Sequence, residues 1–395
     1  MSSMPRPRRF LILTGDAGFG HRSAANSIAK ALTLQHPQDA AVRVVNPIFE
    51  EPVSPLLRDT ERDYDRTVTD SPAWYRFTYE ISDSRPASAL VETTLILALY
   101  KSLKQLFDEA RPDAILNTTQ MFNAPAGAVL RSMKPRPPLY TVVTDLADVH
   151  AMWFNSLPDR FFVASEWVRS QAMASKIAPQ RVCISGIPVD PDFGIERASR
   201  PEVRLRLGLD PYLPALLVVG SRRVSGILDH LEALDGLAQP FQVAVIAGGD
   251  QSLYEKAARR HWNFPILVEN YVTNMAEWML CADLLVTKAG GLILSEGLAA
   301  GLPILMIDYL PGQEEGNVRF ILEHQAGAMV KTPGEFRWRV EAWLRNSQAG
   351  LKAIASTARR LGRPDAALVV ADALWQAVEH GAPLEAPRMR VWNSI

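Results

Sequence analysis

The chain has 395 residues, 48% of them hydrophobic, and a formal net charge of -1 at neutral pH. A chain of this length favours two domains, and its apolar content is ample for two cores. The balanced charge excludes a global attraction to lipid or nucleic acid, and we expect no nucleic-acid partner.

The cysteines and the apolar runs predict a cytoplasmic protein. Cys183 and Cys281 are the only cysteines and fall in different expected domains, so we expect a reducing compartment and no structural disulfide. The apolar run at 10–13 is too short for a signal-peptide core, although arginines precede it. The longest later run, 95–100, is far below the roughly 20 residues that span a bilayer. We expect the protein to be at most peripheral on the cytoplasmic membrane.

The first half opens with a strand, a glycine loop and a helix. Residues 10–14 are apolar without alternation, as in a buried parallel strand, and we expect the helix over 23–34. The loop 15–20 can face a phosphate or a sugar, although it lacks the G-x-G-x-x-G spacing. His21 lies where the loop meets the helix. It is either a solvent-exposed first-turn residue or a general base at the carboxyl edge of the sheet.

An irregular, proline-rich stretch separates the strand expected at 42–45 from the helix expected at 90–110. It carries four aromatic residues close together: Trp74, Tyr75, Phe77 and Tyr79. Such a cluster usually covers a core, which we favour slightly, and the alternative is a patch for an amphiphilic acceptor.

A polar segment follows the strand expected at 139–144, which itself follows a strand expected at 114–117. Asp145 lies at a carboxyl end, where open α/β sheets bind ligands, and either orients a catalytic group or caps a turn. His150 and Trp153 could shape an acceptor pocket, although a core position is the favoured alternative for Trp153. Asp145 and His150 lack the spacing of a metal site, and we expect no metal.

The remaining elements continue the alternation of strand and helix. We interpret residues 197–201 as the connection between domains. Expected strands are 161–164, 182–185, 215–219, 242–247 and 266–268. Expected helices are 166–176, 227–237, one that follows the segment 270–275 and ends at Cys281, and 364–379. In the loop 220–226, backbone amides with Arg222 or Arg223 could hold a diphosphate, but loop arginines are more often only solvated.

The most informative stretch is 284–317, which reads LLVTKAGGLILSEGLAAGLPILMIDYLPGQEEGN. A strand at 284–286 breaks at two glycines, a helix begins near Leu292, and a strand at 303–307 precedes a polar loop. Glycines at a helix start allow a ligand close to the backbone, and the free N–H groups there favour a phosphate. Glu296, which we place in the first turn, could accept hydrogen bonds from a ribose diol. The plain alternative is a tight turn and an acid that matches the helix dipole.

The ordered set in this stretch favours a nucleotide-sugar site. Its members are Lys288, Gly290, Gly291, Glu296, Gln313, Glu314 and Asn317. Because both halves alternate strand and helix, we predict an α/β protein with two Rossmann-like parallel-sheet domains and a ligand cleft between them. The expected domains are 1–196 and 202–363, and residues 364–395 form a helix and tail that pack back toward the first domain.

Five segments resemble the monogalactosyldiacylglycerol synthases and the related bacterial diacylglycerol glucosyltransferases. These are TGDAGFGHRSAA, VVTDLADVHAMWF, SGIPVDPDF, VTKAGGLILSEGLAAGLPI and PGQEEGN, in matching order over residues 10–330. That family is related to the N-acetylglucosaminyltransferase that makes lipid II. The resemblance implies a GT-B fold, a UDP-sugar donor as substrate, no cofactor, and an inverting transfer without a bound metal. It makes the first domain the acceptor and membrane side and the second the UDP-sugar side.

The resemblance also implies roles for individual residues. His21 would deprotonate the acceptor hydroxyl, with Asp145 as a second catalytic residue. The backbone at Val272 would read uracil, Glu296 would bind ribose, and Gly290 and Gly291 would carry the diphosphate. Gln313 and Glu314 would contact sugar hydroxyls, with Asn317 supporting their loop. The set is completed by Gly20, Ser221 and Lys288 on the donor side and His150 and Trp153 on the acceptor side.

Two departures from the family pattern stand out. Asp190 occupies a position where the plant galactolipid enzymes usually have arginine, and the loop 220–226 carries arginines and serine in place of a glycine run. We expect a hexosyltransferase that uses a UDP-sugar and a lipid such as diacylglycerol at the membrane surface, with anionic lipid as an additional candidate partner. The alternatives are a UDP-sugar epimerase or hydrolase without a lipid acceptor, and an inactive nucleotide-sugar-binding protein.

Overall fold

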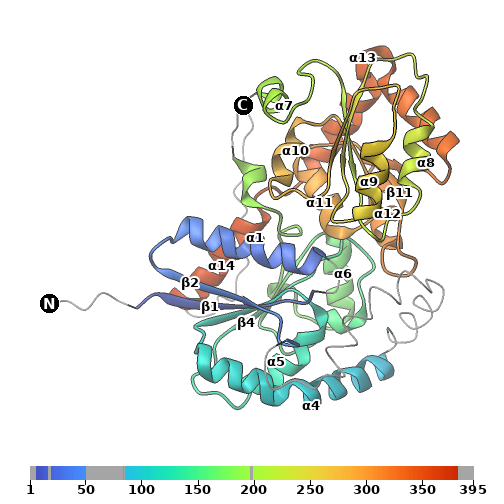
Figure 1. Ribbon diagram of the computed structural model, residues 1–395. Helices are drawn as coiled ribbons and strands as arrows, with labels where there is room; N and C mark the ends of the chain where they lie inside the picture. Colours follow the sequence, from blue (N-terminus) through green and yellow to red (C-terminus); the bar gives the residue numbers. More distant parts are fainter. Residues whose placement is uncertain (1–5, 17–18, 50–82, 84, 196–198, 381–395) are drawn as a thin grey trace. The chain divides into compact units, whose positions relative to one another are not determined.

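The computed structural model describes residues 6–16, 19–49, 83, 85–195 and 199–380. The chain divides into two α/β units (Figure 1). The first unit is Met1–Pro191 with Asp365–Ile395, and the second is Asp192–Pro364. The aromatic cluster of Trp74, Tyr75, Phe77 and Tyr79 lies outside the described residues.

The described part of the first unit contains a six-stranded parallel sheet in the order β2-β1-β3-β4-β5-β6. Its strands are β1 Arg8–Leu13, β2 Ala40–Val45, β3 Ala114–Asn117, β4 Leu139–Val142, β5 Arg160–Val163 and β6 Val182–Ile184. The sequence predicted each of them to within about two residues at either end, because they are short apolar runs bounded by polar or glycine-rich turns.

Helices cover both faces of this sheet, which explains why its strands are apolar without alternation. Along β1, Phe10 and Ile12 pack in a cluster with α1 and α14, whereas Leu11 and Leu13 pack in a cluster with α4 and α5 (Figure 1). The helices are α1 Phe19–Gln35, α4 Arg85–Ala110, α5 Asn123–Leu130, α6 Glu166–Ala174 and α14 Ala366–His380. Short 3₁₀ turns are η1 Gln120–Phe122, η2 Ala151–Trp153 and η3 Pro179–Arg181.

The last described helix returns to the first unit. In α14, Trp375 stacks on His36 with ring centroids 3.5 Å apart and planes 6° apart. The guanidinium of Arg8 lies 4.2 Å from the Trp375 ring and pairs with Glu379 at 3.1 Å. These contacts join the end of the described chain to β1 and to the residue that follows α1.

The described part of the second unit has its own six-stranded parallel sheet, in the order β12-β11-β10-β7-β8-β9. The strands are β7 Ala215–Val219, β8 Gln242–Ile246, β9 Ile266–Glu269, β10 Leu284–Lys288, β11 Ile304–Asp308 and β12 Gly327–Met329. The helices are α7 Arg200–Arg206, α8 Ile227–Glu232, α9 Gln251–Arg259, α10 Met275–Cys281, α11 Gly291–Ala299, α12 Glu315–Glu323 and α13 Pro333–Leu361, with a 3₁₀ turn η4 at Pro191–Gly194.

Two expectations for the second unit are wrong. Residues 200 and 201 are not part of a connection, because they begin α7 in the second unit. Glu202 accepts hydrogen bonds from the backbone N and the hydroxyl of Ser199, both at 2.9 Å, and this pattern starts the helix. The helix expected to reach residue 237 ends at Glu232.

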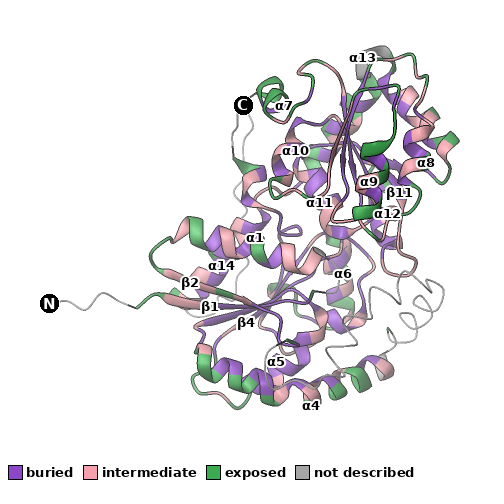
Figure 2. Cartoon of the chain, in the orientation of Figure 1, coloured by how far each residue is buried: buried purple, intermediate pink, exposed green. Residues whose placement is uncertain are grey.

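Most strand residues are buried, whereas the exposed residues of the helices lie on their outer sides (Figure 2). Both cysteines are buried and free, and burial raises the pKa of each, that of Cys281 to about 11. No helix among the described residues combines the length and the apolar character that crossing a membrane requires.

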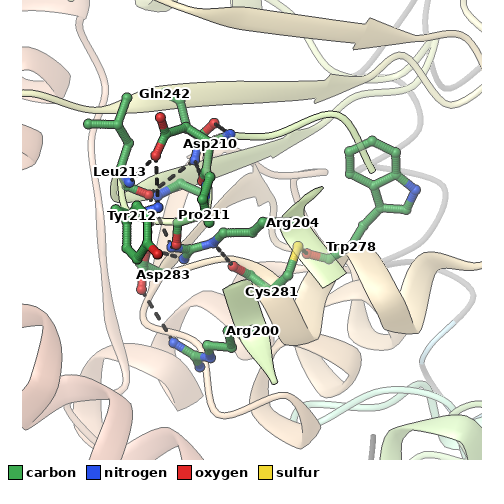
Figure 3. A network of polar contacts seen from close by, with 11 residues as sticks. Arg200, Arg204, Asp210, Pro211, Tyr212, Leu213, Gln242, Trp278, Cys281 and Asp283 are labelled. Carbon is green, nitrogen blue, oxygen red and sulfur yellow. Dashed lines mark hydrogen bonds and ion pairs between the residues drawn. The ribbon is translucent and has the colours of Figure 1, made fainter. Parts of the chain in front are cut away.

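A buried arginine ties together the amino ends of two strands in the second unit (Figure 3). Arg204, 6% exposed, donates to the carbonyl oxygens of Cys281 at 2.8 Å and Leu213 at 3.1 Å. It also pairs with Asp283 at 2.7 Å, and Asp283 accepts from the backbone N of Ala215 at 2.8 Å. Since Ala215 begins β7 and Asp283 precedes β10, one ion pair fixes both strand starts.

We expect Arg204→Met to lower the free energy of unfolding by roughly 3–5 kcal/mol, because it leaves Asp283 poorly solvated without its main cation. Arg206→Met is the matched control on the same helix. Arg206 is 53% exposed in its ion pair with Glu277, and such pairs contribute about 1 kcal/mol or less. Urea unfolding at neutral pH measures both, and equal losses would contradict a structural role for Arg204.

Candidate functional site

The topology of the first sheet points to one place on its carboxyl edge. From β1 the chain moves outward to β2 and then crosses to β3 on the other side of β1. Ligands of open α/β sheets bind outside the carboxyl ends of strands at such a switch point. The segments that leave β1 and β3 there carry His21 and Thr118.

His21 is held by groups from several strand ends. Its Nδ1 lies 2.9 Å from Thr144 Oγ1, which comes from the segment after β4. Its backbone carbonyl accepts a hydrogen bond of 3.2 Å from Thr118 Oγ1. Its ring centroid is 6.1 Å from that of Trp153, with planes 52° apart. The half-buried imidazole is therefore oriented by contacts from the ends of β3 and β4 and from η2.

The start of α1 differs from the prediction. The helix begins at Phe19, so Gly20 belongs to its first turn and not to the preceding loop. Asp16 stabilises this start through a bidentate pair with Arg22, at 2.7 and 3.0 Å, and a 2.9 Å hydrogen bond from Asn46. Burial alone would raise the pKa of Asp16, but the bonds from Arg22 and Asn46 outweigh it and lower the pKa.

A network of buried amide side chains contacts Trp153, whose ring lies beside that of His21. The sequence analysis did not identify this network. Asn123 Oδ1 accepts from Asn117 Nδ2 at 2.6 Å and from Thr141 Oγ1 at 2.7 Å. Asn123 Nδ2 donates to the carbonyl of Trp153 at 3.0 Å. Asn117, Asn123 and Thr141 are all 0% exposed. The available signal was the polar run Asn-Thr-Thr directly after an apolar strand.

Three further predicted residues of the first unit, Asp145, His150 and Trp153, follow β4 in the chain. Trp153 is 1% exposed and packs in a core cluster with Val143, beside the ring of His21. His150 is 5% exposed, and its Nδ1 accepts from the backbone N of Met152 at 3.2 Å. Burial lowers the pKa of His150, and Asp83, 3.7 Å from Nδ1, opposes that shift. Asp145 is half-buried and directly follows Thr144.

The second sheet has its own switch point, between β7 and β10. The chain passes from β7 through β8 to β9 and then returns to β10 on the other side of β7. The loop 220–226 leaves β7 there, and the Lys288–Gly291 segment leaves β10. Both stretches that we singled out for phosphate binding therefore follow neighbouring strands of one sheet.

Several predicted donor-side residues gather at the junction of β10 and α11. Gly290 is the N-cap of the helix and Gly291 its first residue. The ammonium of Lys288 pairs with Glu314 Oε1, and Glu314 Oε2 accepts from the backbone N of Leu310 at 2.8 Å. Asn317, 0% exposed, donates to the carbonyl of Ala289 at 3.1 Å. The cluster places one cation beside a helix start that carries no side-chain cap.

The placement of Glu296 in the first turn of α11 is wrong. The helix begins at Gly291, and because one turn takes about 3.6 residues, Glu296 lies in the second turn. Its side chain is 8% exposed. A favourable interaction with the helix dipole, which fades beyond the first turn, therefore does not explain this acid.

The other donor-side residues occupy neighbouring loops. Ser221 is half-buried, and its Oγ accepts from the backbone N of Arg223 at 3.3 Å. Gln313 is half-buried before α12, and Val272 is half-buried between β9 and α10.

Asp308 anchors the loop 220–226, and the sequence analysis missed it. Its Oδ2 accepts from both the backbone N and the hydroxyl of Ser225 at 3.0 Å. Its Oδ1 accepts from the backbone N of Tyr309 at 2.9 Å. The anchor leaves Arg222 exposed and Arg223 half-buried. Within the described residues, no group of three or more His, Cys, Asp or Glu side chains could hold a metal ion.

Known proteins resemble this chain in sequence and in fold. Residues 21–189 match the family described as "Monogalactosyldiacylglycerol (MGDG) synthase". The chloroplastic monogalactosyldiacylglycerol synthase of Spinacia oleracea is 30% identical, over 91% of this chain and 70% of that protein. Monogalactosyldiacylglycerol synthase 3 of Arabidopsis thaliana is 29% identical, over 91% of this chain and 79% of that protein.

Solved structures extend the likeness to the fold alone. MurG of Acinetobacter baumannii is 16% identical with a TM-score of 0.59, over 94% of this chain and 100% of that one. A putative UDP-N-acetylglucosamine 2-epimerase of Listeria monocytogenes is 13% identical with a TM-score of 0.61, over 97% and 100%. With two parallel-sheet α/β units, the chain has the GT-B fold, as predicted.

We expect His150→Asn to flatten the dependence of stability on pH. Because the pKa of His150 is lower in the fold than its unfolded value near 6.5, the unfolded chain binds the proton more readily. The wild type therefore loses stability as the pH falls below about 6.5. Asparagine removes this titration and can still cap the Met152 amide.

Thermal unfolding midpoints at pH 7.5 and 5.5 measure the effect of this substitution. The control is His261→Asn at an exposed histidine, which should keep the wild-type slope. If wild type and His150→Asn respond in parallel, the effect of burial on His150 is refuted.

Proposed function

The chain belongs to the monogalactosyldiacylglycerol synthase family, and we propose that it transfers a hexose from a UDP-sugar to a lipid such as diacylglycerol. That the protein is a glycosyltransferase enzyme follows from the family. The proposal adds the donor, the acceptor, inversion at the anomeric carbon and independence from metal. The observation that carries it is the junction of β10 and α11, where Lys288 and an uncapped helix start meet at a switch point.

On the donor side, the diphosphate binds at the amides of Gly290 and Gly291. Helix N-termini attract anions through their free N–H groups and their dipole. The ammonium of Lys288, which pairs with Glu314, has three N–H donors and can also donate to the diphosphate. The carboxylate of Glu296 accepts hydrogen bonds from the ribose diol. The backbone at Val272 reads the uracil edge, and Ser221 belongs to the loop after β7 that lines the diphosphate.

The sugar is recognised by the segment that begins α12. Gln313 and Glu314 contact its hydroxyl groups. The two bonds that Glu314 makes, to Lys288 and to Leu310 N, fix the direction of its carboxylate. Asn317 supports the segment through its bond to Ala289. This set could serve glucose, galactose or an N-acetylated sugar.

On the acceptor side, His21 acts as general base, with Asp145 as the second catalytic residue. The imidazole takes the proton of the acceptor hydroxyl, whose oxygen forms a bond to the anomeric carbon. The bond from that carbon to the phosphate oxygen breaks, and UDP leaves with the electron pair. With no metal to neutralise the leaving group, amides and the helix dipole supply the stabilisation.

Access to the lipid is proposed to occur by peripheral docking at the cytoplasmic membrane surface, where anionic lipid could contribute. Support comes from the outer side of α4, where Leu90 is 70% and Leu97 79% exposed. Apolar side chains at a helix surface can enter the headgroup boundary without spanning the bilayer. His150 and Trp153 are proposed to shape the acceptor side of the first unit.

A UDP-sugar epimerase or hydrolase is the second candidate, because the Listeria structure shares the fold. Sequence favours the transferase. The relatives matched over 91% of the chain at 29–30% identity are named synthases, whereas the epimerase is 13% identical. An epimerase or hydrolase would consume the donor in water without acceptor, and an inactive protein would bind UDP without consuming the donor.

We expect one radiolabelled UDP-hexose to yield a labelled lipid. The protein is incubated with UDP-glucose, UDP-galactose or UDP-N-acetylglucosamine and either total lipid extract or dioleoylglycerol, with and without EDTA. Thin-layer chromatography and mass spectrometry should show a monohexosyl diacylglycerol in both EDTA arms. Donor turnover that is independent of lipid would indicate the epimerase or hydrolase instead.

We expect His21→Ala to lower kcat by about 10²–10⁴-fold, the usual contribution of a positioned general base. The affinity for UDP, measured by calorimetry, should stay within about twofold, because the donor-side residues other than Gly20 are assigned to the second unit. His261→Ala, at an exposed histidine, is the control and should keep full activity. Wild-type turnover by His21→Ala would remove this residue from the mechanism.

A further inference from the structure

The imidazole of His21 has two nitrogens, and the hydroxyl of Thr144 lies 2.9 Å from one of them, Nδ1. We propose that Thr144 is the positioning residue of the base: its hydroxyl oxygen accepts a hydrogen bond from His21 Nδ1–H. The neutral ring then carries its lone pair on Nε2, the nitrogen that takes the proton. This inference deepens the proposed function and rests on it for the role of His21.

The position of Thr144 is fixed by the sheet. It lies two residues beyond the end of β4 and is 6% exposed. The intervening Val143 still pairs with the neighbouring strand, because its backbone N donates to Phe162 O at 2.9 Å. Threonine is branched at Cβ and has few side-chain rotamers. The hydroxyl therefore meets Nδ1, at 2.9 Å, from a rigid support.

The ring is restrained from other directions as well. Thr118 Oγ1 lies 3.2 Å from the backbone carbonyl oxygen of His21 and 3.3 Å from that of Leu13, and its one hydrogen is shared between these two acceptors. The indole of Trp153 lies beside the ring, and Asn123 fixes the backbone of that tryptophan. The backbone and the ring are thus restrained while the hydroxyl of Thr144 contacts Nδ1.

A hydroxyl can accept from or donate to a ring nitrogen, and the two cases differ in chemistry. A neutral imidazole carries one N–H. If Thr144 donates to Nδ1, the hydrogen sits on Nε2, which then cannot take a proton. If Nδ1–H donates to Thr144, Nε2 holds the lone pair. When Nε2 gains the acceptor's proton, both nitrogens carry hydrogen and the Nδ1–H bond to Thr144 persists, so the ring need not move.

The tautomer can be observed without any activity. The full chain is labelled with ¹⁵N-histidine, and two-bond ¹H–¹⁵N correlations are recorded at pH 8. His21→Ala assigns the signal among the seven histidines. We expect the Nδ1–H tautomer at His21 in the wild type and its loss or mixing in Thr144→Val. An Nε2–H tautomer at His21 in the wild type would overturn the proposal.

The kinetic test separates positioning from folding. With UDP-glucose or UDP-galactose and dioleoylglycerol, Thr144→Val should lower kcat about 10- to 100-fold with the donor KM unchanged, because one hydrogen bond to the ring is lost. Thr144→Ser keeps the hydroxyl and should restore most of kcat. Full kcat in Thr144→Val, or no rescue by serine, would refute the role of the hydroxyl.

The matched control is Tyr140→Phe in β4. It also removes a buried hydroxyl, and the described residues offer that hydroxyl no hydrogen-bond partner. This variant should keep wild-type kcat and KM. A wild type that makes no lipid product but shows Nδ1–H at His21 would refute the proposed function and leave standing only the tautomer that Thr144 selects.

Discussion

Each parallel sheet contains one pair of neighbouring strands from which the chain departs in opposite directions, and the candidate site follows from this constraint. The segments that leave β1 and β3 run apart, and so do those that leave β7 and β10. Because the polar groups of two such segments do not pair with each other, they need other partners. The first unit supplies side chains for this purpose, among them Asn117 and Asn123. The second keeps a helix start without a side-chain cap at Gly290. The same topology therefore yields a restrained imidazole in one unit and the proposed anion site in the other.

The opposite edge of the second sheet serves stability. There the Arg204–Asp283 pair joins the starts of β7 and β10, the same two strands whose far ends carry the candidate site. A buried ion pair is costly to desolvate, and its gain lies in fixing a unique arrangement once every donor and acceptor is paired. By setting the relative register of β7 and β10, the pair also fixes where the loop 220–226 and Lys288 emerge. The ion pair at the amino edge of the sheet therefore helps to position the candidate site at its carboxyl edge.

The sequence predicted the strands well and the hydrogen-bonded partners poorly, for a physical reason. A buried strand is a local apolar pattern, so β3 and β7 were placed correctly at both ends. The contact between Thr144 and His21 joins residues 123 positions apart, and no local pattern encodes it. Family resemblance indicated His21 but not its partner. Helix starts were predicted poorly where side-chain hydrogen bonds set them, as at α7, where Glu202 accepts from Ser199. Glu296 was assigned to the wrong turn because the turn was counted from an approximate helix start.

The two departures from the family pattern are each accommodated within one unit. Asp190, where the plant enzymes usually have arginine, pairs with Lys30 of α1 at 2.7 Å. The reversed charge is thereby neutralised on α1, the helix that carries His21 in its first turn, and the ion pair helps to hold that helix in the first unit. In the loop 220–226, Ser225 bonds to Asp308. A serine anchored at both its N–H and its hydroxyl restricts the loop in a way that a flexible glycine run does not. Because both changes have partners inside the same unit, neither requires a different fold, and their influence on donor choice would act through the placement of α1 and of this loop.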